Sequence, residues 1–262
     1  MAPAVVFRLG DFVVTSSMIV AVFTAAVIIG IVQVAMRAPK IVPSGLQNVV
    51  EAVVEGIGNF LETILGYEMM KRGYWFFATI FIFILSCNVF SLFPGVGTFG
   101  YGHGTDFWNF EVTQPFFRGP NADVNLTAAM SLVYFVTWVI WSLQMQGPWG
   151  MMVHIFGPKT KFSNTLINIL FGILFLFIGV VEMISILFRP FTFTFRLYGN
   201  IYGGENLLDS LYHLAPTWAV VLLTPFYFYE LLVAFIQAFV FFVLTAVFTA
   251  LMRPHSSEGA AH

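Results

Sequence analysis

Charged residues are scarce in this chain of 262 residues. They make up 9% of the sequence, whereas a soluble domain usually has about 25%. Hydrophobic residues make up 59%, and 32 of them are phenylalanine. This balance excludes water as the main solvent of the folded chain and indicates a membrane protein.

Cysteine is almost absent too, because Cys87 stands alone. A single cysteine excludes a disulfide within the chain and a cysteine metal cluster. The histidines have no ligand spacing, and the sequence contains neither a glycine-rich phosphate loop nor an internal repeat. We therefore expect no metal and no cofactor. The net charge of −2 gives no sign of a nucleic-acid partner.

What is abundant is long apolar runs. Several reach the roughly 20 residues that a helix needs to cross a bilayer. We predict an all-α membrane protein with about five transmembrane helices, formed by one integral domain over residues 1–262. Its expected parts are a retained first helix at 12–36, an amphipathic cytoplasmic-surface helix at 43–65, a hairpin at 73–146 with an outer loop at 94–122, and a strongly tilted channel hairpin at 163–252.

Lysine and arginine gather in alternate connections, which predicts the orientation of the chain. If the spans alternate, one side receives Arg37, Lys40, Lys71, Arg72, Lys159, Lys161 and Arg253. We expect this side, and with it the C-terminus, to be cytoplasmic. The N-terminus and the loop 94–122 then face outward.

The amphipathic helix has an acidic polar face that carries Glu51, Glu55 and Glu62. Surface helices that bind anionic lipid favour Lys and Arg instead. A protein partner is therefore our interpretation of this face, and a helix that only rests at the interface is the alternative.

The stretch 163–212 has 50 residues, which one straight helix would extend over about 75 Å. Such a helix must either tilt steeply in a bilayer or break. Pro190 is a candidate for a break or kink, because it removes an amide donor. One helix or two both remain possible at this point.

Charged groups at membrane depth are costly and usually mark ion pathways or buried pairs. The last two apolar stretches contain the ionisable side chains of Glu182, Arg189, Arg196, Glu205, Asp209 and Glu230, together with Gln237. The first three are seven residues apart, which places them on one stripe of a regular helix, and Asn200 extends that stripe.

Each of these residues also has a structural interpretation. Arg196 could be one half of a buried ion pair with Glu230 or another carboxylate, and Arg189 could bond the carbonyls freed at Pro190. Glu205 and Glu230 could be neutral acids that tie helices together by hydrogen bonds. The functional alternative is that a buried carboxyl group carries a proton near neutral pH. Asp209 lies near the outer end and is expected to be solvated.

Four segments in order resemble the F-type ATP synthase subunit a family. The sequence FRLYGNIYGGENLL (195–208) resembles the signature of that family, and the others are PNADVNLT (120–127), NVFSLFPG (88–95) and IQAFVFFVLTAVF (236–248). The resemblance covers most of the chain from about residue 43 to 252.

The resemblance implies a stator subunit of the F0 sector that couples proton flow to rotation of a ring of c subunits. By position, Arg196 is similar to the essential arginine that faces the ring. Other family positions that carry proton-pathway groups correspond here to Asp123, Glu182, Asn200, Glu205, Glu230 and Gln237. Some members have histidine where this chain has Glu230, so the pathway here lacks an imidazole.

The resemblance also implies partners and a location. The partners are the c ring, the b subunits of the peripheral stalk and the rest of the ATP synthase, and the location is an energy-transducing membrane, the bacterial plasma membrane. A stand-alone ion transporter or channel with buried carboxylates is the competing interpretation, but it predicts related halves. A purely structural anchor would leave the cost of Arg196 unexplained.

Overall fold

The computed structural model describes residues 5–10, 12–93, 100–103, 111–115, 118–157, 165–214 and 218–252. Its helices are α1 (Ser16–Ala35), α2 (Leu46–Leu65), α3 (Tyr67–Ser91), the short 3-10 helix η2 (Pro120–Ala122), α4 (Val124–Phe156), α5 (Thr165–Leu214) and α6 (Ala219–Leu251). Its strands are β1 (Val5–Leu9), β2 (Phe12–Thr15), β3 (Gly100–His103) and β4 (Glu111–Pro115).

Five of the described helices, α1, α3, α4, α5 and α6, are long and apolar enough to cross a membrane. The amphipathic α2 has the expected helical form between the first two of them. The prediction of an all-α membrane protein is therefore confirmed.

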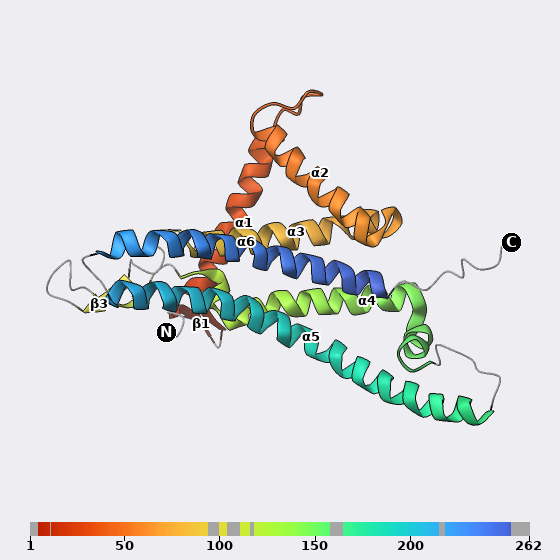
Figure 1. The fold of residues 1–262 in the computed structure, drawn as a ribbon. Helices are drawn as coiled ribbons and strands as arrows, with labels where there is room; N and C mark the ends of the chain where they lie inside the picture. Colours follow the sequence, from red (N-terminus) through yellow and green to blue (C-terminus); the bar gives the residue numbers. More distant parts are fainter. Residues whose placement is uncertain are drawn as a thin grey trace.

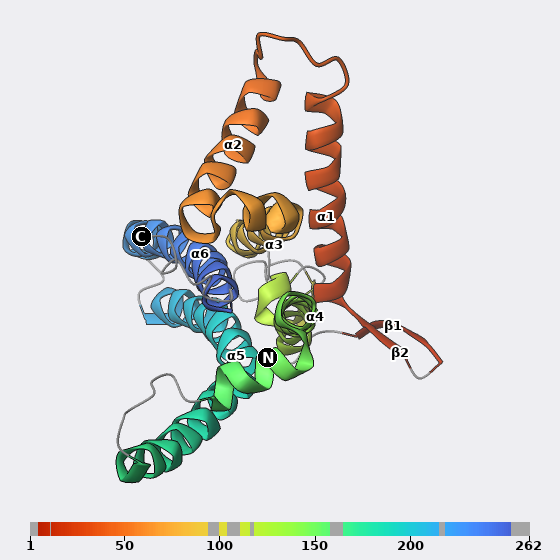
Figure 2. The ribbon, with the colours of Figure 1, turned by 90° about the vertical axis from the view of Figure 1, so that its right-hand side faces the viewer.

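The helices form a layer that α1 crosses steeply. In Figure 1, α3, α4 and α6 run side by side, and α5 lies along α6 before it diverges from the bundle. Figure 2 looks along these helices and shows α1 and α2 standing across them. The elbow between α2 and α3 and the C-terminal end of α6 lie at the same end of the molecule, whereas the turn between α1 and α2 projects away from the layer of helices.

Two small hairpins of strands were not anticipated. Strand β2 pairs with β1 around Gly10, which has a positive φ of 63°, and β3 pairs with β4. Both strands of the first hairpin are rich in valine and phenylalanine, which favour a pleated surface. Helix α1 consequently begins at Ser16, later than the apolar span expected from residue 12.

Helix α5 continues through Pro190 without a break, so the long stretch is one helix. The hydroxyl of Thr194 donates to the Pro190 carbonyl at 2.8 Å and lies 3.1 Å from Ser131 Oγ on α4. At about 75 Å, such a helix fits a bilayer only at a steep inclination. The break in this region lies in α4 instead, at Gly147, where φ is 69°.

The core includes side chains of α2 to α6, and one part of it lies where α5 packs against α4 and α6. On α5 the buried side chains of Phe193, Leu197 and Ile201 recur every fourth residue. The Phe193 ring lies 4.8 Å from that of Phe241 and 5.6 Å from that of Tyr134, measured between centroids. This packing determines which face of α5 points away from the bundle.

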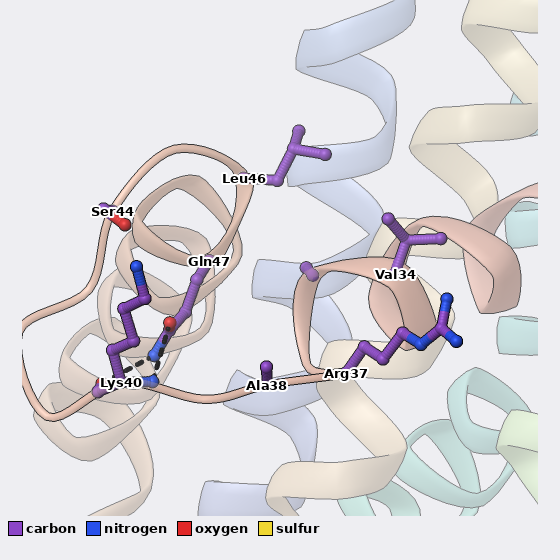
Figure 3. A pocket seen from close by; sticks show the side chains of 8 residues that line it. Val34, Arg37, Ala38, Lys40, Ser44, Leu46 and Gln47 are labelled. Atoms are coloured by element: carbon purple, nitrogen blue, oxygen red, sulfur yellow. Dashed lines mark hydrogen bonds between the residues drawn. The ribbon is translucent and has the colours of Figure 1, made fainter.

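The turn between α1 and α2 is closed by Gln47. Its side-chain amide donates to the Lys40 carbonyl at 2.9 Å and accepts from the Lys40 amide at 3.1 Å (Figure 3). It also donates to Glu51 at 2.7 Å. Further along α2, the buried Ile57 and Leu61 join the core, while Glu55 stays exposed.

Candidate functional site

Arg196 lies on the face of α5 that points away from the core. Its neighbour Leu197 is fully buried, whereas the Arg196 side chain is exposed. Among the described residues, none forms a hydrogen bond or an ion pair with it. The structural alternative of an Arg196–Glu230 pair is therefore not what this structure contains.

The surface around Arg196 is apolar. Phe188, Phe191 and Phe195 are each about 60% exposed on the same helix. An isolated guanidinium on such a surface at membrane depth is costly unless a partner compensates its charge. This face of α5 therefore has the chemistry of an interface with an anionic group.

One turn beyond Arg196, an amide pair joins the two helices of the hairpin. The side chain of Asn200 on α5 donates to Gln237 Oε1 on α6 at 3.4 Å. Gln237 is buried and Asn200 half-buried. The structure thus brings together two of the predicted site residues.

Glu230 lies on α6 directly against the backbone of α5. The contact point is Gly204, where a Cβ atom would lie within 2.8 Å of both carboxylate oxygens of Glu230. Glu230 is only 5% exposed. Gly204 thus allows a close approach of α6, whereas a Cβ atom on Gly203 would meet open space.

Glu205 follows Gly204 and meets the connection that leads into η2. A Cβ atom on Gly119 would lie 3.1 Å from Glu205 Oε1 and would also clash with Ser91. No hydrogen bond joins Glu205 to Glu230 in the described part of the chain. The alternative of two acids tied together by a hydrogen bond is therefore not realised.

Arg118 is a member of this cluster that the sequence did not single out. It was assigned only to the outward loop, yet it is 5% exposed and acts electrostatically on the carboxyl group of Glu205. Its position next to the PNAD segment was the only signal available. Its burial accompanies the packing of the adjacent η2 against α5, which helical periodicity does not reveal.

Asp123 is a buried helix cap at the start of α4. Its Oδ1 accepts from the amide of Asn125 at 2.9 Å, and its Oδ2 accepts from the hydroxyl of Thr15 at 3.3 Å. Nearby, Asn121 donates to Asn88, which donates to the Ala234 carbonyl on α6. A buried polar network therefore connects η2, α3 and α6 on the Glu205 side of Arg196.

Glu182 lies on the opposite side of Arg196. It is half-buried on α5 beside a hollow of about 390 Å³ that Phe177, Val181 and Ser185 also line. Glu182 precedes Arg196 by 14 residues and Glu205 follows it by nine. Along the helix axis these separations are about 21 Å and 14 Å.

Arg189 lies between Glu182 and Arg196, but its surroundings are aromatic. Its guanidinium carbon is 3.9 Å from the ring centroid of Phe248 and 5.4 Å from that of Trp138. Its Nε and Nη1 atoms are buried and have no hydrogen-bond partner among the described residues. The expectation that it bonds carbonyls freed by Pro190 is wrong; cation–π contacts hold it instead.

Asp209 ends the series on α5. It is exposed and lies 3.6 Å from Nε2 of His213, which is exposed as well. This agrees with the expected solvated position near the helix end.

Comparison with known proteins decides which family this arrangement belongs to. The family model described as ATP synthase A chain matches residues 17–250. The chain belongs to the ATP synthase subunit a family. It is 34% identical to the ATP synthase subunit a of Solidesulfovibrio magneticus over 90% of this chain and 83% of that protein. It is also 34% identical to that of Geobacter sp. strain M21, over 87% and 84% respectively.

Membership in the subunit a family makes this chain a multi-pass membrane channel subunit of an F-type ATP synthase. The interpretation as a stand-alone transporter loses its support, because the match spans almost every described helix. ATP synthesis and proton transport are the activities of the complex of which such a subunit is part.

Proposed function

We propose that this chain provides two offset proton half-channels, separated by Arg196, that couple transmembrane proton flow to rotation of the c ring and to ATP synthesis. The observation that carries the proposal is the exposed Arg196 on an apolar face of α5, with Glu182 and Glu205 on either side along the helix. The family resemblance supports a ring carboxylate as the group that this arginine meets.

Arginine suits this position because its guanidinium remains protonated in an apolar site, whereas a buried lysine can lose its proton. A permanent positive charge keeps a passing carboxylate ionised and repels a cation that would cross directly between the half-channels. Protons then cross only by riding the ring. Each charge that crosses releases about 2.3 kcal/mol per 100 mV.

The outer half-channel is proposed to run through Asp123, Glu205 and Glu230. The buried polar network around η2 and the position of both glutamates at the hairpin support this path. The proposed inner half-channel opens at Glu182 beside its hollow. Asn200 and Gln237 lie between Arg196 and the outer group and are proposed to guide the proton to the ring.

The proposed partners follow from the surfaces that remain uncovered. The exposed apolar face of α5 suits the c ring, and the acidic, exposed polar face of α2 suits the b subunits of the peripheral stalk. We place the complex in the bacterial plasma membrane with the C-terminus cytoplasmic. The elbow before Lys71 and Arg72 lies at the same end of the molecule as the C-terminal end of α6, which supports this orientation.

The decisive experiment replaces the fixed charge. Arg196→Ala should abolish ATP-driven acidification of inverted vesicles, while the complex still co-purifies with its ring and stalk. Passive proton conductance should rise, because no charge then separates the half-channels.

A matched control removes another charge from the same helix. Asp209→Asn lies at the exposed end of α5, so it should pump like the wild type. Pumping at the wild-type rate by Arg196→Ala, at matched subunit levels, would refute the mechanism.

A further inference from the structure

A separate cavity lies at the elbow between α2 and α3, and side chains of α4 and of the C-terminal part of α6 also line it. Its volume is about 740 Å³, and its lining differs on two sides. Glu68, Arg72 and Gln144 supply polar groups, while Phe77 and Trp141 supply an apolar floor. None of these residues belongs to the proposed proton path.

Two opposite charges at the rim are available to a ligand. Glu68 and Arg72 are one turn apart on α3, a spacing at which such residues usually pair. Both side chains are exposed, and neither forms an ion pair or hydrogen bond with any residue that the structure describes. The rim therefore presents one anionic and one cationic group to the same cavity.

The floor of the cavity is held in place by aromatic packing. Gly73 lets Trp141 approach the backbone of α3, since a Cβ atom there would lie 3.1 Å from Trp141 Cη2. The Trp141 ring also lies 5.5 Å from that of Phe76 and 5.8 Å from that of Phe77, between centroids. A rigid apolar surface of this kind suits acyl chains.

The surroundings place the cavity at the level of lipid headgroups. Tyr67, Trp75 and Trp149 are exposed near it, at 57%, 65% and 79%. Exposed tryptophan and tyrosine gather at membrane interfaces, and basic residues such as Lys71 follow the cytoplasmic side.

We propose that this cavity is a binding site for a phospholipid with a zwitterionic, primary-amine headgroup, namely phosphatidylethanolamine. The lipid phosphate binds Arg72, the ammonium group donates to Glu68, and the Gln144 amide supplies a further donor. The glycerol backbone and the start of the acyl chains lie over Phe77 and Trp141. Glu68 disfavours a purely anionic headgroup, and a quaternary choline offers it no hydrogen bond.

The hollow at the α1–α2 turn has a different lining from that of the elbow cavity. Arg37 and Lys40 line that hollow, but their cationic ends lie on opposite sides of the turn (Figure 3). No carboxylate lines it among the described residues. Of these two hollows in the described part of the chain, the elbow cavity is the one that combines both charges with an apolar floor.

The test uses the whole ATP synthase complex in phosphatidylcholine nanodiscs that contain a small fraction of a photoreactive lipid. The three probes carry an acyl-chain diazirine and differ only in headgroup: phosphatidylethanolamine, phosphatidylglycerol or phosphatidylcholine. Cross-linked peptides are mapped by mass spectrometry. The phosphatidylethanolamine probe should label peptides around Phe77 and Trp141 most strongly.

Substitutions at the rim decide the proposal. Because each charged hydrogen bond contributes about tenfold to affinity, Glu68→Gln and Arg72→Gln should each reduce this labelling by about tenfold. Lys71→Gln is the matched control, since Lys71 is exposed beside Arg72 but does not line the cavity. Its labelling should match the wild type.

Three results would overturn the proposal. One is equal phosphatidylethanolamine labelling in all variants, and another is stronger labelling by phosphatidylglycerol in the wild type. The third is an elbow that takes no lipid in the complete complex, because a helix of another subunit would then fill the cavity. Glu68→Gln gives an internal check, since removal of its charge should increase labelling by phosphatidylglycerol.

Discussion

Arg189 and Arg196 are two cations on the same helix, seven residues apart, and their surroundings differ sharply. Arg189 lies against the rings of Trp138 and Phe248, which belong to α4 and α6. Arg196 extends from an exposed apolar face and contacts no anion among the described residues. The chain thus covers the cation of Arg189 with its own aromatic rings and leaves that of Arg196 for a partner.

This difference shows that charged residues on one stripe of a helix can have different surroundings in the folded protein. At 100° per residue, seven positions advance by 20° less than two full turns. A further difference comes from the neighbours, because α4 and α6 cover α5 at Arg189. The residue type alone therefore does not distinguish a structural arginine from a functional one.

The largest expected difference in pumping rate is between two single variants, in each of which one of these arginines becomes lysine. Arg196→Lys should lower ATP-driven pumping by at least about tenfold, because a compact ammonium that can deprotonate does not replace a permanent planar charge. Arg189→Lys keeps a cation over the same rings and should pump near the wild-type rate. Acidification of inverted vesicles at matched subunit levels measures both.

The same measurement can break the comparison. If Arg189→Lys pumped as poorly as Arg196→Lys, both arginines would belong to the ion path. The assignment of a structural role to Arg189 and a functional role to Arg196 would then be wrong.

A second prediction concerns the carboxyl groups on the outer side of Arg196. The double change Glu205→Gln with Glu230→Gln removes both groups that can release a proton but keeps their size and hydrogen-bonding capacity. Proton flux, passive and driven, should fall severely while the complex still assembles. Unchanged flux with normal assembly would return both glutamates to a structural role.

A third prediction compares two adjacent glycines on α5. Gly204→Ala places a methyl group against the Glu230 carboxylate, and overpacking of this kind costs about 1–3 kcal/mol. Gly203→Ala points into open space. Only the first should therefore slow proton flux.

Thermal denaturation of each glycine variant adds a second measurement, because Gly204→Ala should also lower the melting temperature. Equal behaviour of the two variants would mean that the contact between Gly204 and Glu230 is not maintained in the membrane.

Much of the fold and part of the site could be predicted from the sequence, for physical reasons. Apolar length gave the membrane helices, since an unpaired backbone is too costly in lipid. The periodicity of Glu182, Arg189 and Arg196 gave a common stripe. The short hairpin β1–β2 was missed because an apolar run of four residues fits a strand as well as a helix start.

The rest depends on contacts between distant segments. The burial of Arg118 beside Glu205 and the hydrogen bond from Thr15 to Asp123 both join segments that are far apart in the sequence. The cation–π contacts of Arg189 require two other helices to cross at the right height. No local sequence pattern specifies these contacts between distant segments.

The smallest expected effect is that of Arg189→Ala. Cation–π contacts stabilise by about 0.5–2 kcal/mol, depending on how far they are desolvated. The loss should lower the melting temperature of the complex by a few degrees, while assembled complexes still pump. Arg189→Lys keeps the cation and should melt close to the wild type. A melting temperature unchanged in Arg189→Ala, combined with lost pumping, would move this arginine from the structural side of the comparison to the functional side.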